Sequence, residues 1–113
     1  MNASLPAGLE AAALIRQAEA AGDFAAILKK GDPDRGSLLL LISSRGRHHA
    51  CLERMLIADG SYRWHATGPA ESASSDDLRE FLARRARFDA DSWMIELDVA
   101  DPERFVAETT SLT

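Results

Sequence analysis

The sequence predicts a single α+β domain spanning residues 1–113, with three helices and an antiparallel sheet of four to five strands. Three observations lead to this prediction. The length of 113 residues suits one domain, and 46% hydrophobic residues can supply its core. Apolar residues recur at helical spacing near the N-terminus, whereas from Phe24 onwards short apolar segments alternate with turn residues. Connections this short join neighbouring antiparallel strands.

The first helix is expected to begin at Leu5, with Ser4 as its N-cap and Pro6 in its first turn, and to end at Gly22. Small and aliphatic residues recur along one side of it, namely Ala7, Ala11, Leu14, Ile15 and Ala18. Such a stripe lets the helix lie close to another layer of the fold. We expect it to pack rather than to carry chemistry.

Four strands are expected to follow as a meander, over residues 24–30, 37–43, 48–57 and 61–67. The sequences between them are rich in Gly, Asp and Pro, which are typical of turns. If Arg45-Gly46 and Asp59-Gly60 are both two-residue type I′ turns, Ile42 lies opposite His49, Leu40 opposite Cys51, and Ile57 opposite Tyr62.

This register divides the sheet residues between two faces. One face is nearly dry, and we expect the helices to cover it: Leu40, Ile42, Cys51, Met55, Ile57, Tyr62, Trp64 and Ala66. The other face has four leucines without a clear cover inside the chain, Leu39, Leu41, Leu52 and Leu56. An uncovered apolar face suits a second copy or another partner. We therefore expect a homodimer that forms either through these four leucines or through an edge strand of the sheet.

The second helix is expected to follow a serine-rich loop, with Ser75 as its cap and Asp76 and Asp77 in its first turn. Its buried stripe consists of Leu78, Phe81, Leu82 and Ala86. Arg85 lies near this stripe on a helical wheel, so we expect it to need an acidic partner.

The last part of the chain predicts one more strand and one more helix. Residues 93–99 alternate, with Trp93, Ile95, Leu97 and Val99 expected inward and Met94, Glu96 and Asp98 outward. Asp101-Pro102 then opens a short third helix that is expected to run to Glu108.

Composition excludes several classes of protein. The net charge of −5 is a poor match for nucleic acid. Cys51 is the only cysteine, so the chain cannot close an internal disulfide. The densest apolar run, residues 38–42, is far too short to cross a bilayer, and the N-terminus lacks the basic start of a signal peptide. We expect a cytoplasmic protein without membrane association.

The residues that could carry catalysis or bind a metal all have simpler structural interpretations. His48 and His49 are adjacent in a strand and point to opposite faces, unless a bulge intervenes, and His65 lies beside Arg54. We therefore expect no metal and no cofactor. Cys51 is expected to pack in the core. The pairs Asp32/Asp34 and Glu96/Asp98 are interpreted as a turn and a solvated strand face.

One alternative to a binding domain remains open. Residues 29–87 have eleven basic and eight acidic side chains, a net charge of +3. Lys29, Lys30 and Arg35 gather at the ends of the first hairpin, and Arg87 ends the second helix. These four residues could bind a small anionic ligand such as a phosphorylated metabolite, as an enzyme or as a binder. No standard nucleotide-binding or hydrolase motif is present.

Two stretches of the chain together resemble a known family. These are residues 24–36, FAAILKKGDPDRG, and residues 87–96, RFDADSWMIE. They are similar to motifs of a bacterial family of small proteins catalogued as domain of unknown function 1491, in which the second motif usually has proline where this chain has Ala90. The resemblance extends to Phe105 and implies no activity and no catalytic residue. The leading hypothesis is therefore a non-enzymatic binding or adaptor domain that self-associates, with the anion binder as the alternative.

Overall fold

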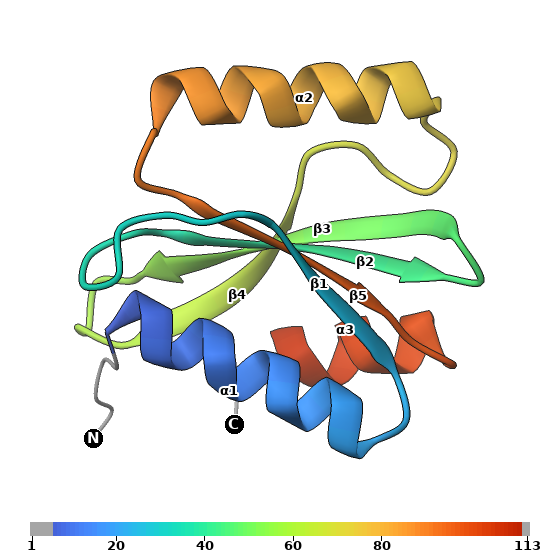
Figure 1. Cartoon of the computed structure of the whole chain (residues 1–113), viewed down its shortest axis with the longest axis horizontal. Coiled ribbons are helices and arrows are strands. Elements are labelled where there is room, and N and C mark those ends of the chain that lie inside the picture. Colours follow the sequence, from blue (N-terminus) through green and yellow to red (C-terminus); the bar gives the residue numbers. More distant parts are fainter. Residues whose placement is uncertain (1–5, 112–113) are drawn as a thin grey trace.

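The structure of the chain, a computed structural model, describes residues 6–111, so the expected cap Ser4 and the expected helix start at Leu5 lie outside the described residues. Figure 1 shows a five-stranded sheet with α2 on one face and with α1 and α3 on the other. The predicted α+β class and the predicted order of elements are confirmed. The elements are α1 (Ala7–Ala20), β1 (Phe24–Lys29), β2 (Leu38–Ser44), β3 (Arg47–Leu56), β4 (Tyr62–Thr67), α2 (Ser75–Phe88), β5 (Trp93–Asp98) and α3 (Pro102–Thr110).

The strand order is β1-β5-β2-β3-β4, which corrects the predicted meander at one point. β5 lies between β1 and β2, antiparallel to β1 and parallel to β2, so the first two strands do not pair. The physical reason is visible in β5 itself. Met94, which was expected to face outward, is buried like Trp93 and Ile95. Residues 93–95 of β5 are thus apolar on both faces, as suits a strand in the middle of a covered sheet, whereas Glu96 and Asp98 at its other end are only partly buried.

The turn between β2 and β3 has the expected geometry but not the expected register. Arg45 and Gly46 have φ angles of 54° and 80°, as a type I′ turn requires. A bulge follows in β3, so that Ile42 pairs with Ala50 rather than with His49, which is the extra residue. Every pair beyond the bulge is therefore displaced by one residue.

The turn between β3 and β4 is one residue longer than expected. The backbone N–H of Ile57 donates to the carbonyl oxygen of Ser61 (2.9 Å). The N–H of Gly60 donates to the carbonyl oxygen of Ile57 (3.0 Å). Gly60 has a φ of 89°. This is a three-residue loop that closes with a glycine bulge. Leu56, not Ile57, consequently lies opposite Tyr62.

These register differences change which face each side chain occupies, because a slip of one residue turns a side chain to the other side of the sheet. Leu39 and Leu41 pack with Cys51 and Met94 beneath α2, against Leu78, Phe81, Leu82 and Ala86. Leu52 packs with the core beneath α1 and α3, together with Leu38, Leu40, Ile42, Trp93, Ile95 and Leu97. Both faces of the sheet are therefore covered within the chain.

The expected interface leucines must be corrected accordingly. Leu39, Leu41 and Leu52 are at most 5% exposed, so the premise that they lack a cover is wrong, and they are core residues. Only Leu56 is exposed, at 60%. On the face that was expected to be dry, Met55 and Tyr62 are also exposed at their end of the sheet.

The starts of α2 and α3 are fixed by local capping side chains. The hydroxyl of Ser74 accepts from the N–H of Asp77 (3.0 Å), so the cap lies one residue before the expected Ser75. The carboxylate of Asp101 accepts from the N–H of Arg104 (3.1 Å), as the Asp-Pro start predicted. Within residues 6–111, no helix is long and apolar enough to cross a membrane.

Candidate functional site

Lys29 was expected in an anion site, but the structure gives its ammonium group a different task. Its Nζ donates to the carbonyl oxygens of Ala90 (2.6 Å) and Ser92 (2.7 Å), which belong to the turn between α2 and β5. A third, longer contact joins Nζ to the carbonyl oxygen of Lys30 (3.5 Å), so all three donors of the ammonium group face backbone carbonyls. Lys29 thus fastens the end of β1 to this turn.

Further hydrogen bonds join the loop between β1 and β2 to the same turn and to α1. The N–H of Asp32 donates to the carbonyl oxygen of Asp91 (2.9 Å), and the indole Nε1 of Trp93 donates to the carbonyl oxygen of Asp32 (2.8 Å). On its other side, the loop accepts a hydrogen bond from the first turn of α1, where the N–H of Gly8 donates to Pro33 (2.8 Å). Three distant parts of the chain therefore meet here.

We call residues 29–37 together with residues 89–93 the loop junction. Two glycines allow the backbones of its two halves to approach closely. A Cβ atom would lie 2.1 Å from the carbonyl oxygen of Asp91 if added to Gly31, and 2.2 Å from it if added to Gly36. Both positions thus require glycine for lack of space.

The acidic residues of the loop junction act as turn formers, as the sequence predicted for Asp32. Its carboxylate accepts from the N–H groups of Arg35 and Asp34, both at 2.8 Å. These two hydrogen bonds, that from Arg35 foremost, hold the pKa of Asp32 below its ordinary value. The carboxylate is therefore committed to the turn.

The other three residues of the expected anion site, Lys30, Arg35 and Arg87, are exposed. None of them forms an ion pair with another residue of the described range 6–111. They belong to the loop junction or directly precede its second half. The structure thus separates Lys29, which is bonded internally, from three cations that face solvent.

Glu96 and Asp98, the second carboxylate pair, brace the turn between β2 and β3. Asp98 accepts from the N–H groups of Gly46 (2.9 Å) and Arg45 (3.0 Å), and the hydroxyl of Ser43 lies within hydrogen-bonding distance of both carboxylates. The bond from Gly46 is the main cause of the lowered pKa of Asp98. In the described part of the chain, no group of three or more His, Cys, Asp and Glu side chains is placed to hold a metal ion.

Two consecutive residues of β3 tie the sheet to both helical layers. Glu53 pairs with Arg85 of α2, with one contact at 3.1 Å, and so provides the acidic partner that was expected for Arg85. Arg54 pairs with Glu10 of α1, and its guanidinium lies 4.4 Å from the centre of the Tyr62 ring. Burial lowers the pKa of Arg54. These contacts hold the layers together rather than forming a reactive site.

The two adjacent histidines of β3 both contact the loop that precedes α2. His48 Nε2 lies 3.0 Å from the carbonyl oxygen of Pro69, and His49 Nδ1 lies 3.9 Å from the carboxylate of Glu71. The bulge at His49 explains why both reach this loop instead of pointing to opposite faces, as they would in a regular strand.

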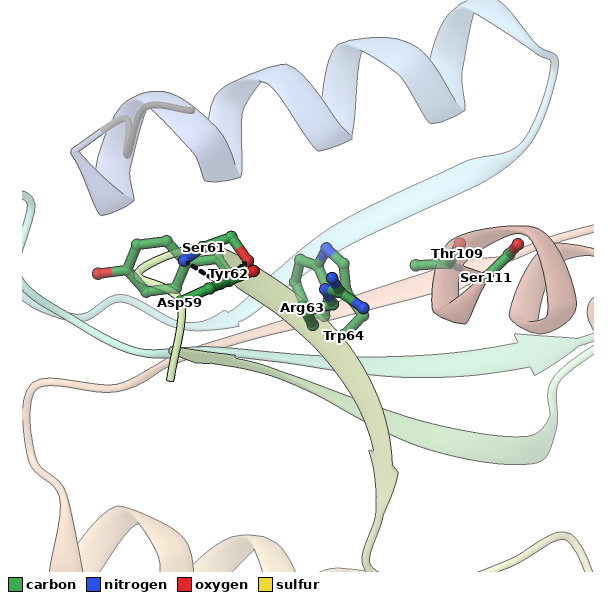
Figure 2. Close-up of a pocket in the computed structure, with 7 residues that line it drawn as sticks. All are labelled: Asp59, Ser61, Tyr62, Arg63, Trp64, Thr109 and Ser111. Atoms are coloured by element: carbon green, nitrogen blue, oxygen red, sulfur yellow. Dashed lines mark hydrogen bonds between the residues drawn. The ribbon is translucent and has the colours of Figure 1, made fainter. Parts of the chain in front are cut away.

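A polar pocket of about 390 Å³ lies between the β3–β4 turn and the end of α3. Figure 2 shows Arg63 and Trp64 of β4 between the residues of the turn and Thr109 and Ser111. The carboxylate of Asp59 in this pocket accepts from the hydroxyl (2.6 Å) and the N–H (2.9 Å) of Ser61, which lower its pKa. The described residues that line it include hydroxyl groups and one guanidinium, but neither His nor Cys.

A second, more apolar cleft of about 390 Å³ lies on the other side of Trp64. Its walls come from α1 and α3, and its floor comes from the sheet. Sequence reasoning missed both cavities. Each depends on how two helices lie across the sheet, and the sequence pattern of one helix carries no signal for that arrangement.

The two edges of the sheet differ in character. β1 forms one edge, and Phe24, Ile27 and Leu28 on it are 60%, 44% and 50% exposed. β4 forms the other edge and carries Arg63 and His65. Among residues 6–111, no strand pairs with the outer side of β1, so β1 is an apolar edge, whereas β4 is a polar one.

A family model described as "Protein of unknown function (DUF1491)" matches residues 5–107. The chain belongs to the DUF1491 family. The resemblance of residues 24–36 and 87–96 to this family is thereby confirmed, and these two DUF1491 motifs contain the loop junction except for Ser37. The motifs therefore meet in space through the contacts of Lys29, Asp32 and Trp93.

Three solved structures, two of them of DUF1491 family proteins, have a similar fold. The crystal structure of a DUF1491 family protein from Caulobacter crescentus CB15 is 30% identical, with 90% of this chain and 94% of that chain covered and a TM-score of 0.78. An NMR structure of a DUF1491 family protein from the same organism is 32% identical, with 89% and 91% covered and a TM-score of 0.74. The solution structure of Atu0922 from A. tumefaciens is 25% identical, with 86% and 87% covered and a TM-score of 0.72. No curated protein matches the chain.

Proposed function

We propose that this DUF1491 protein is a binding module that pairs with a second copy of itself through the free edge of β1. One observation carries the proposal. From Phe24 to Leu28 the edge strand contains no charged residue and no proline, and three of its large apolar side chains are 44–60% exposed. Edge strands of natural proteins usually carry charges, prolines or covers that prevent pairing.

The geometry of an edge suits a symmetric partner. In an antiparallel pair about a two-fold axis through Ala26, Ala25 of one copy lies opposite Ile27 of the other. Phe24 then lies near Leu28, which is the extra residue of the bulge between Ile27 and Lys29. Each apolar side chain then meets another apolar side chain. The opposite edge, β4, offers Arg63 and His65 at the corresponding positions and is less suited to pairing with itself.

The groups that could perform catalysis are largely engaged in structural contacts, which favours a binding role. Burial raises the pKa of the Cys51 thiol to about 11. The carboxylates of Asp32, Asp59 and Asp98 accept hydrogen bonds within turns. Lys29 is bonded to two carbonyl groups.

Sedimentation velocity over a wide concentration range tests the proposal. The wild-type chain is expected to form a dimer, and Ile27→Lys is expected to weaken dimerisation at least tenfold because it places a charge on the pairing edge. Leu9→Lys is the matched control, since Leu9 is equally apolar and 60% exposed but lies on α1. A wild-type chain that stays monomeric at high concentration, or equal effects of the two variants, would overturn the proposal.

The second candidate function is binding of a small anion at Lys30, Arg35 and Arg87. It is supported by the exposure of these three cations and their lack of an ion pair within residues 6–111. Inorganic phosphate and pyrophosphate at millimolar concentration should then raise the melting temperature. Arg87→Gln should remove the shift, whereas Arg84→Gln on the same helix should not. A flat response of the wild-type chain would exclude this function.

A further inference from the structure

We infer that the cleft between α1 and α3 is a binding site for a small ligand with an apolar body and one protonated amine. The cleft has a volume of about 390 Å³, within the range of small-molecule sites. Its apolar surface comes from both helices and from the sheet between them: Leu14, Ala18 and Ala21 of the α1 wall, Trp64 and Leu97 of the floor, and Phe105 of α3.

The cleft is open beside two short side chains of its α1 wall, which also contains Leu14 and Gln17. At Ala18 and Ala21, methyl groups face a space that longer side chains would fill. Phe105 reaches in from α3, and the indole of Trp64, which is partly buried, forms part of the floor. An aromatic or aliphatic body can therefore be enclosed on three sides.

The polar groups around the cleft select for a cation. Gln17, Asp23 and Thr109 are its polar lining residues. Asp23 is held in place by its backbone N–H, which donates to the carbonyl oxygen of Ala18 (2.8 Å). Its carboxylate has no ion pair and no hydrogen bond to another residue of the described range. A protonated amine is the natural partner of this carboxylate, and the face of an indole ring also attracts cations.

The helices on both sides of the cleft have a net negative charge, like the Asp23 carboxylate itself. α1 contains Glu10, Arg16 and Glu19, a net charge of −1, and α3 with its cap Asp101 also contains Glu103, Arg104 and Glu108, a net charge of −2. Arg104, the only basic residue of the latter segment, is paired with Glu108 (3.0 Å). The last turns of both helices, where the helix dipole is negative, also contribute to the lining through Gln17, Ala18 and Thr109. A cleft between two acidic walls attracts cations and repels anions.

Three probes with the same apolar body separate charge from size: 4-phenylbutylamine, 4-phenylbutanol and 4-phenylbutanoate. Titrations monitored by tryptophan fluorescence and by calorimetry are expected to show saturable binding of the amine. The signal comes from Trp64, because Trp93 is buried and hydrogen-bonded in the loop junction. The amine should bind about threefold more tightly than the alcohol, as a partly exposed ion pair does, and the acid more weakly than either. In 1 M NaCl, the preference for the amine should disappear.

Two pairs of measurements on variants complete the test. Ala21→Leu should fill the mouth of the cleft and reduce amine binding at least tenfold, while Ala20→Leu, at the neighbouring exposed position outside the cleft, should leave it unchanged. Asp23→Asn should lower the affinity for the amine to that for the alcohol. Unfolding curves of each variant show that the fold is retained.

Absence of saturable amine binding would overturn the inference, as would equal affinities of the three probes or unchanged binding by Ala21→Leu. Since the cleft contains no residue of β1, a failure to bind the amine and a failure to dimerise are independent results.

Discussion

Replacing Gly36 with alanine tests whether the loop junction depends on the close approach of two backbones. The new Cβ would lie 2.2 Å from the carbonyl oxygen of Asp91 and 2.8 Å from Cδ1 of Trp93. Ordinary contacts of this kind begin at 3.4 Å, so the two segments must separate by about 1 Å. Such a movement disrupts the hydrogen bonds from Trp93 to Asp32 and from Asp32 to Asp91.

The expected cost follows from these contacts. Two hydrogen bonds contribute about 0.5–1.5 kcal/mol each, and overpacking a close contact costs about 1–3 kcal/mol. We expect Gly36→Ala to lower the free energy of unfolding by about 4 kcal/mol, a large part of the roughly 5–15 kcal/mol of a typical domain. Urea unfolding followed by tryptophan fluorescence measures the change, with the slope of the transition unaltered.

Gly46→Ala is the matched control for this prediction. Gly46 has a φ of 80°, and no atom lies within 4 Å of the position that its Cβ would take. Alanine there strains only the backbone, at a cost of about 1–2 kcal/mol. If Gly36→Ala costs no more than Gly46→Ala, the close approach of the two backbones is not what holds the loop junction together.

Three further predictions concern groups whose partners are known. Lys29→Met, which keeps most of the side chain but removes the ammonium group, should lower the free energy of unfolding by about 2 kcal/mol, because two carbonyl groups lose a charged donor. A double-mutant cycle of Glu53→Gln and Arg85→Met, measured by urea unfolding, should give a coupling energy of about 1–2 kcal/mol, because both side chains are only 21% exposed. Since burial raises the pKa of Cys51 from 9.0 to about 11, the neutral thiol is favoured in the folded state, and stability should fall by about 2–3 kcal/mol as the pH rises from 9 to 11. Unfolding of Cys51→Ala in parallel should show a smaller loss.

Each of these expectations has an opposing result. If Lys29→Met leaves the free energy of unfolding unchanged but abolishes phosphate binding, Lys29 binds an anion and does not stabilise the loop junction. Additive effects of the Glu53 and Arg85 substitutions would show that the pair contributes nothing beyond its separate side chains. Identical alkaline unfolding of the wild-type chain and Cys51→Ala would show that the thiol is not shielded from solvent.

Local features of this fold could be predicted because a few neighbouring residues decide them. The type I′ geometry at Arg45-Gly46 follows from a two-residue connection that contains Gly46, since glycine adopts positive φ without strain. The start of α3 follows from Asp101-Pro102. The need of Arg85 for an acidic partner could be inferred from its position beside an apolar stripe, although the partner itself could not.

The register of both hairpins could not be predicted in the same way. A bulge inserts one residue into β3 at His49, and a glycine bulge closes the loop before β4. Each changes the face of every residue beyond it. Leu52 therefore moved from an expected interface to the core, and Arg54 came to lie against Glu10.

The strand order also depends on contacts between distant residues. β5 inserts between two strands that are consecutive in sequence, and the sequence contained a sign of this, since Met94 breaks the alternation of apolar and polar residues. The loop junction also depends on contacts between residues that are distant in the sequence. Its two halves are recognisable as motifs, but only the pairing of β1 with β5 brings Lys29 to residues 90–92.

By itself, the sequence determined the helices and strands and the geometry of the Arg45-Gly46 turn, because hydrogen bonds and steric limits over a few residues are enough to decide each of them. The uneven charge and the resemblance to the family are properties of the sequence itself. Only the tertiary structure decided which strand lies in the middle, which side of the sheet each leucine faces, and that a cleft opens beside Trp64. These features arise from burying both faces of one sheet at once, and that free energy belongs to the whole chain rather than to any segment of it.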